Sequence, residues 1–114
     1  MLSIRKVSTV VLFVCVLSLI PRNLFAGVKC PEPGQVQAQK VDKDWYLLAG
    51  DPTKCGSFVH AEIGQGKFVC LYRNDVVMVY DKKWFPPQPE NAEVWKKTGQ
   101  VRQCEAGIDE CTIK

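Results

Sequence analysis

Hydrophobic and polar positions alternate with a period of two through the middle of the chain, which is the pattern of half-buried β-strands. The segments that show it are DWYLLA (44–49), SFVHAEI (57–63), KFVCLYR (67–73) and VVMVYD (76–81). Short turn sequences join the last three of these segments: Gly64-Gln65-Gly66 and Asn74-Asp75. Such turns connect adjacent antiparallel strands. The pattern therefore predicts an antiparallel sheet built on three hairpin-linked strands.

The segments on either side of these strands have weaker patterns. Residues 30–35 are rich in proline and are predicted to be extended, and residues 36–41 are a candidate first strand. Residues 89–99 fit a short helix between Asn91 and Gly99, and they fit a strand through Trp95 equally well. The expected fold class is mainly β: a small antiparallel sheet or a partly open β-barrel or sandwich, with at most one short helix.

The beginning of the chain has the pattern of a secretory signal peptide. A basic start precedes a continuous apolar run at residues 10–20, and Ala26 offers a small residue before a cleavage point. An uncleaved membrane anchor is the alternative. A spanning helix needs about 20 apolar residues, and Arg22 ends this run well short of that. We expect residues 1–26 to be removed and residues 27–114 to form a single disulfide-bonded β domain.

Removing the signal changes the charge of the protein. The first 26 residues carry three of the 15 basic residues and no acidic residue, so the remaining 88 residues have a net charge of zero. The basic character of the whole chain thus belongs to the signal, and it gives no reason to expect binding to nucleic acid or stable insertion into a membrane. A domain of this size has a small core, and small exported domains commonly add disulfides.

Five cysteines remain after removal of the signal: Cys30, Cys55, Cys70, Cys104 and Cys111. In an oxidising compartment an odd number predicts two disulfides and one unpaired thiol. Cys55 lies in a segment dense in turn residues, so we predict that it is free or forms an intermolecular bond. Three pairings of the other four are open. We favour Cys70–Cys111 and Cys30–Cys104, because these bonds tie the ends of the domain to the sheet.

The sequence offers few residues for catalysis. His60 is the only histidine, and it lies within a predicted strand, where a structural role is the usual one. A Cys55–His60 pair is conceivable as a reactive thiolate, but nearness in sequence alone is a poor criterion. No two cysteines have the spacing of a zinc knuckle or of a C-x-x-C redox motif. We therefore expect no catalytic residue, no metal and no cofactor.

Aromatic and proline residues adjoin at Trp84, Phe85, Pro86 and Pro87. Two interpretations compete. The aromatic side chains fold back and cover one end of the sheet, or the four residues form a rigid exposed ridge for a protein partner. A domain this small needs its aromatic residues inside, which favours the first interpretation.

Several short motifs together resemble a known family. They are CP at residues 30–31, DWY at 44–46, GKFVCLY at 66–72, Trp95, and the cysteines in VRQC and ECTI. Over residues 28–114 the chain is similar to the EirA family, small periplasmic proteins of intracellular Gram-negative pathogens associated with the Dot/Icm-type type IV secretion system. The resemblance implies a non-enzymatic factor that supports effector secretion and intracellular replication through protein–protein contact, with secretion-system components as partners. It supplies no catalytic residues.

Other functions and assembly states stay open at this point. An inhibitor of a lysozyme or protease would present one rigid loop, at residues 50–57 or 82–90. An unrecognised enzyme is disfavoured by the lack of convergent acid and base residues. A homodimer is a further expectation, through a disulfide at Cys55 or through pairing along an open strand edge.

Overall fold

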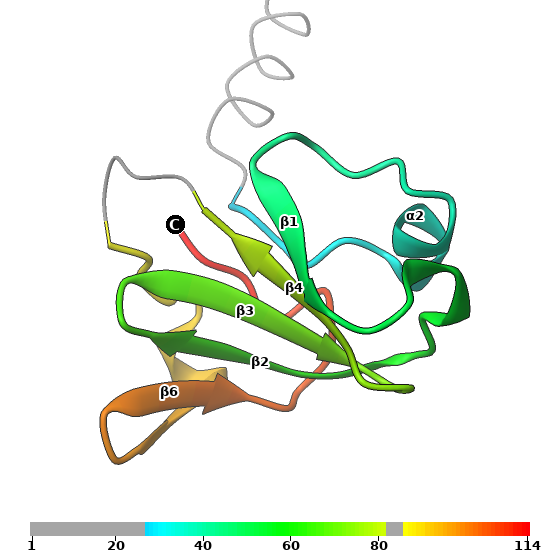
Figure 1. Cartoon of the computed structure of the whole chain (residues 1–114). Helices are drawn as coiled ribbons and strands as arrows, with labels where there is room; N and C mark the ends of the chain where they lie inside the picture. The colour runs from blue at the N-terminus through cyan, green and yellow to red at the C-terminus, as the bar shows by residue number, and fades with distance from the viewer. Residues whose placement is uncertain (1–26, 82–85) are drawn as a thin grey trace, which may run out of the picture.

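The computed structural model describes residues 27–81 and 86–114, and its main feature is one antiparallel sheet of six strands (Figure 1). In chain order the elements are α2 (Pro33–Gln37), β1 (Trp45–Ala49), the 3₁₀ turn η1 (Pro52–Lys54), β2 (Phe58–Gly64), β3 (Lys67–Tyr72), β4 (Val76–Tyr80), the 3₁₀ turn η2 (Ala92–Val94), β5 (Trp95–Thr98) and β6 (Val101–Cys104). The strand order is β1-β4-β3-β2-β6-β5. The predicted fold class, a mainly β antiparallel sheet with at most one short helix, is confirmed.

The three hairpin-linked strands lie where the alternating pattern placed them. β2 pairs with β3 and β3 pairs with β4, both antiparallel. The turn between β2 and β3 has positive φ angles at Gln65 (52°) and Gly66 (74°). The turn between β3 and β4 has them at Asn74 (68°) and Asp75 (60°). Two successive left-handed residues give the turn whose twist matches that of the flanking strands, so the local sequence fixes both hairpins.

The N-terminal part of the domain differs from the prediction. Residues 30–35 were expected to be extended and 36–41 to be a strand, but the chain forms α2 instead. Pro33 occupies the first turn, where its missing N–H is not needed. The side chain of Gln35 accepts a hydrogen bond from the backbone N–H of Glu32, the reciprocal half of a capping box. The proline pattern thus marked the start of a helix.

The C-terminal part combines the two alternatives that the sequence left open. Within residues 89–99, η2 is a single 3₁₀ turn and β5 follows it directly. The segment ECTI (110–113) contributes two isolated antiparallel bridges, in which Ile113 pairs with Val28 and with Pro89. The two ends of the domain therefore meet beside the sheet.

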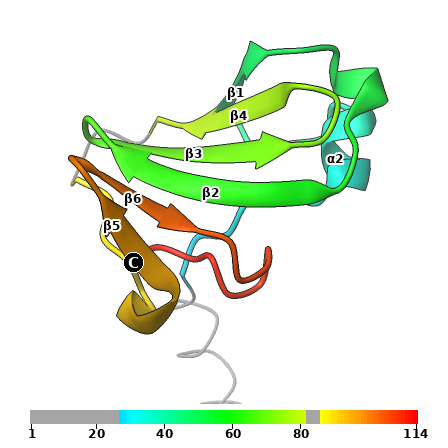
Figure 2. The same ribbon diagram turned by 90° about the horizontal axis from the view of Figure 1, so that it is seen from below.

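One face of the sheet carries the core, and we call it the inner face. Phe68 at its centre packs against Trp45 and Trp95, with ring centroids 5.7 and 6.2 Å apart. Val36 of α2 and Ile113 of the C-terminal segment belong to the same buried cluster. In Figure 2 the C-terminal segment runs beneath β2 and β3, on this side of the sheet.

Candidate interaction surface

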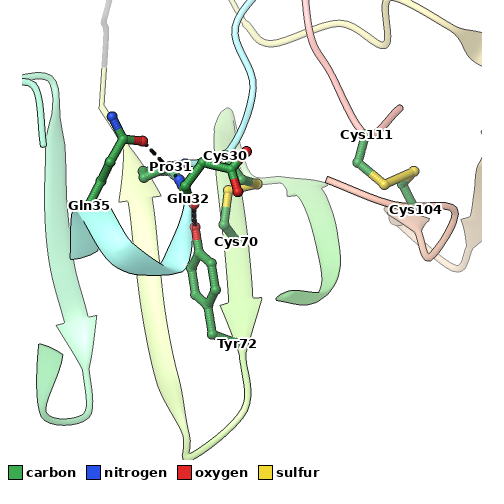
Figure 3. The surroundings of a disulfide bond; sticks show 8 residues. All are labelled: Cys30, Pro31, Glu32, Gln35, Cys70, Tyr72, Cys104 and Cys111. Atoms are coloured by element: carbon green, nitrogen blue, oxygen red, sulfur yellow. Dashed lines mark hydrogen bonds between the residues drawn. A yellow bond between two sulfur atoms is a disulfide. The ribbon is translucent and has the colours of Figure 1, made fainter. Parts of the chain in front are cut away.

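The disulfides join different partners from those that the sequence analysis favoured. The bonds are Cys30–Cys70 and Cys104–Cys111 (Figure 3), so the expected pairings Cys70–Cys111 and Cys30–Cys104 are wrong. The reason is the position of the C-terminal segment, which turns back immediately after β6. This turn brings Cys111 to Cys104, seven residues away in sequence. Cys70 in the central strand β3 therefore bonds to Cys30 of the N-terminal segment.

The Cys30–Cys70 bond is part of a larger attachment of the N-terminal segment to β3. The hydroxyl of Tyr72 donates a 2.6 Å hydrogen bond to the backbone carbonyl of Pro31 (Figure 3). Both groups are buried, and burial raises the pKa of the Tyr72 phenol well above its usual range. The phenol therefore stays protonated and remains a donor at any physiological pH.

Cys55 is the unpaired cysteine among the described residues, and it is 1% exposed. It ends the η1 turn, and its backbone carbonyl accepts a hydrogen bond from the side chain of Gln37. Burial raises the pKa of the Cys55 thiol, whereas a reactive cysteine needs a lowered one. In this conformation the thiol cannot reach a second molecule, so the route to a disulfide-linked dimer through Cys55 conflicts with the structure.

His60 lies in β2 with 18% of its side chain exposed. Its ring nitrogen Nε2 is 3.1 Å from the Glu62 carboxylate, two residues along the same strand. The described residues hold no cluster of three or more His, Cys, Asp or Glu side chains suited to a metal ion. The imidazole thus has an ordinary local partner on the sheet surface.

The aromatic–proline ridge lies only partly within the described residues. Trp84 and Phe85 fall outside them, Pro86 is exposed and Pro87 is half-buried. The structure therefore describes only the proline half of that predicted surface.

The strongest surface feature is one that the sequence analysis did not name: an apolar patch on the sheet face opposite the core, which we call the outer face. Five of its residues stand opposite each other across adjacent strands: Tyr46, Val69, Leu71, Val77 and Val79. The other two, Leu48 and Val59, occupy positions that the register skips. Val79 is 1% exposed yet does not belong to the buried cluster of the inner face, because it packs on the other side of the sheet. No described helix or strand lies over the outer face in Figures 1 and 2.

Two register irregularities enlarge the outer face. One lies between Leu47 and Ala49 in β1, and the other between Phe58 and His60 in β2. A bulge places two successive residues opposite one partner, so an extra side chain appears at that point. The extra residues are Leu48, which is 61% exposed, and Val59, which is 46% exposed. Both bulges thus add an aliphatic side chain in contact with solvent.

The two edges of the sheet differ in character. The edge strand β5 carries Lys96 and Lys97, and charged side chains of this kind protect an edge from pairing with another chain. The other edge strand, β1, has no charged residue and exposes Leu47 and Leu48. The apolar outer face therefore continues to an edge that lacks charge protection.

A polar rim borders the outer face. Lys67 of β3 donates a 3.2 Å hydrogen bond to the Tyr46 hydroxyl and lies 5.8 Å from the centre of that ring. This hydrogen bond raises the pKa of the Lys67 ammonium. The His60–Glu62 pair stands on β2, farther along the same face. An apolar centre with a polar rim is the usual anatomy of a protein-binding surface.

Within the described part of the chain, no helix is both long enough and apolar enough to cross a membrane. No protein-family model, no curated protein sequence and no solved structure matches this chain.

Proposed function

We propose that this protein is a non-enzymatic factor of the bacterial periplasm that supports type IV secretion of effectors, and hence intracellular replication, by binding another protein. The outer face is the contact surface in this proposal. The resemblance described in the sequence analysis supports the link to secretion. The observation that supports action by contact is the apolar outer face, which no described helix or strand covers and on which Leu48 and Val59 are the most exposed aliphatic side chains.

The shape of the outer face favours a protein over a small molecule. Small-molecule ligands bind in concave sites that bury most of their surface. The outer face is instead one side of a sheet, whose side chains come from β1, β4, β3 and β2 in turn. A contiguous exposed apolar patch with a polar rim on a small domain marks an interaction site. The two disulfides fit the oxidising periplasm.

A pair of lysine substitutions on the outer face tests the proposal. Leu48→Lys together with Val59→Lys places two charges in the patch, and both positions are exposed enough to keep the fold intact. We expect normal amounts of folded protein in the periplasm, a loss of effector translocation, and loss of secretion-system components from a periplasmic pull-down.

The matched control adds the same two charges elsewhere. Thr98→Lys with Gln100→Lys lies on the exposed β5–β6 hairpin, and this variant should translocate effectors normally. Normal translocation by the outer-face variant would refute the proposal. Capture of a lysozyme or protease, with stoichiometric inhibition by the purified protein, would replace it with the inhibitor function.

Self-association of this protein would use the same region as a protein partner, and the mass of the purified protein distinguishes the two. β1 is an uncharged edge, which favours pairing with the β1 strand of a second copy. The bulge at Leu47–Ala49 opposes such pairing, because bulges interrupt the regular ladder that an added strand needs. Sedimentation of the purified protein as a dimer that becomes a monomer with Leu48→Lys would assign the patch to self-association.

A further inference from the structure

Gly27, the first described residue, lies in close contact with the C-terminal part of the domain. A side-chain Cβ built at this glycine would meet the carboxylate of Glu90 and would lie 2.7 Å from the backbone carbonyl oxygen of Ile113. A backbone atom cannot move aside easily, so the position requires glycine. The same space is two bonds away from the Gly27 nitrogen, since both substituents are attached to the same Cα.

Glu90 is held in place at this contact. Its carboxylate oxygen Oε1 accepts a 2.9 Å hydrogen bond from the Thr112 hydroxyl, and its backbone N–H donates to the Thr112 carbonyl at 3.0 Å. Val28, which follows Gly27, exchanges two 2.9 Å backbone hydrogen bonds with Ile113. Three segments therefore meet here, and the second carboxylate oxygen, Oε2, faces Gly27.

We propose that cleavage of the Ala26–Gly27 peptide bond by a signal peptidase creates an α-ammonium group on Gly27 that pairs with the Glu90 carboxylate and fastens the two ends of the domain together. The peptidase adds water across the bond. The new carboxylate leaves on Ala26, and the amine stays on Gly27 and takes a proton from solvent. Before cleavage the same nitrogen is an uncharged amide, so the ion pair exists only in the processed protein.

The other charged groups of the adjoining segments do not replace this pair. Lys29 is already shared between Glu32 and Asp109, at 2.9 and 2.8 Å. The hydrogen bond to Asp109 is the main reason that the pKa of Lys29 is raised, and the hydrogen bond to Glu32 adds to it. On the C-terminal side lies Lys114, whose backbone N–H donates to the carbonyl of Gln88. Glu90 is therefore the acid placed against Gly27.

The inference rests on the export assumed in the proposed function and not on the outer face. The test uses protein exported from the full chain and purified from the periplasm. N-terminal sequencing should begin at Gly27. In ¹⁵N-labelled protein, the α-ammonium should titrate about half a pH unit above its ordinary pKa of about 7.7–8.0, as expected for an exposed ion pair. Glu90→Gln should return it to the ordinary range.

The pH dependence of stability gives a second readout. A raised pKa in the folded state stabilises the protein below the ordinary α-amino pKa, and this contribution disappears as pH rises through the folded-state value. Glu90→Gln should therefore lower the thermal midpoint by a few °C at pH 6 and leave it unchanged at pH 10. Glutamine keeps an acceptor for Thr112, so the variant should fold.

Glu93→Gln is the matched control, because Glu93 is an exposed acid of the neighbouring η2 turn. It should change neither the α-ammonium titration nor the difference between pH 6 and pH 10. A mature N-terminus other than Gly27 would overturn the inference. So would an α-ammonium pKa that is the same in the wild type and in Glu90→Gln. Failure of either kind would leave the outer-face proposal untouched, and loss of effector translocation in the outer-face variant would not support the ion pair.

Discussion

The two disulfides should differ in their contributions to stability, because they close loops of very different length. Cys30–Cys70 spans 40 residues and Cys104–Cys111 spans seven. In the chain-entropy model, a disulfide stabilises a protein by restricting its unfolded chain, and the effect grows with the logarithm of loop length. The model gives about 4 kcal/mol for the first bond and about 2.4 kcal/mol for the second. The expected difference is thus about 1.5 kcal/mol.

The perturbation is a pair of double variants, Cys30→Ala with Cys70→Ala, and Cys104→Ala with Cys111→Ala. All four side chains are fully buried, so the packing lost on truncation is similar in the two variants and largely cancels in the comparison. Alanine avoids the cost of burying an unpaired serine hydroxyl. The first variant also loosens the segment that holds the Tyr72–Pro31 hydrogen bond, which adds to its loss.

Urea unfolding of the purified variants measures the difference. With an m-value near 1–1.5 kcal/mol/M for a domain of this size, the two midpoints should lie about 1 M apart. The Cys30→Ala, Cys70→Ala variant should be the less stable. Equal losses, or a larger loss from the Cys104→Ala, Cys111→Ala variant, would refute the loop-length reasoning. Non-reducing peptide mapping that finds Cys30–Cys104 would refute the pairing itself.

Three further substitutions or reactions test the interior. Tyr72→Phe should cost about 1–2 kcal/mol in the free energy of unfolding, measured by urea denaturation, because it leaves the buried Pro31 carbonyl without its donor. Cys55 should react with an aromatic disulfide reagent only at the rate of unfolding at pH 8, since its thiol is 1% exposed; fast labelling of the native protein would contradict this. Gly50→Ala should lower the thermal midpoint by several °C, because Gly50 has φ +90° and a Cβ would lie 2.5 Å from the Asp75 carbonyl oxygen; an unchanged midpoint would show that the turn adapts.

The sheet could be predicted from sequence because its signals are local. Alternation in KFVCLYR and VVMVYD identifies strands, and Asn74-Asp75 identifies the turn between them. α2 was missed because it is only five residues long and its helical signals are a proline and a capping box, which also suit an extended segment. Short elements of this kind take their conformation from tertiary contacts, here the Cys30–Cys70 bond.

The outer face could not be predicted with the same ease. Alternation shows that Val69, Leu71, Val77 and Val79 share one side of the sheet, but it does not show which side the termini cover. Phe68, Cys70 and Tyr72 lie on the other side. The Cys30–Cys70 disulfide attaches the N-terminal segment to that side, so that side becomes the buried one. The two bulges depend on strand register and leave no mark in the sequence.

The Cys30–Cys70 bond has a consequence for the export proposed above. It turns residues 30–70 into a covalent ring that encloses α2, β1 and β2. A linear polymer can thread a narrow channel one strand at a time, whereas a ring must pass as two strands abreast, so threading has to precede oxidation. In N-to-C emergence Cys55 meets Cys30 before Cys70 appears. The first bond within reach is therefore a non-native Cys30–Cys55 loop, and thiol exchange would have to resolve such a bond before Cys30 could pair with Cys70.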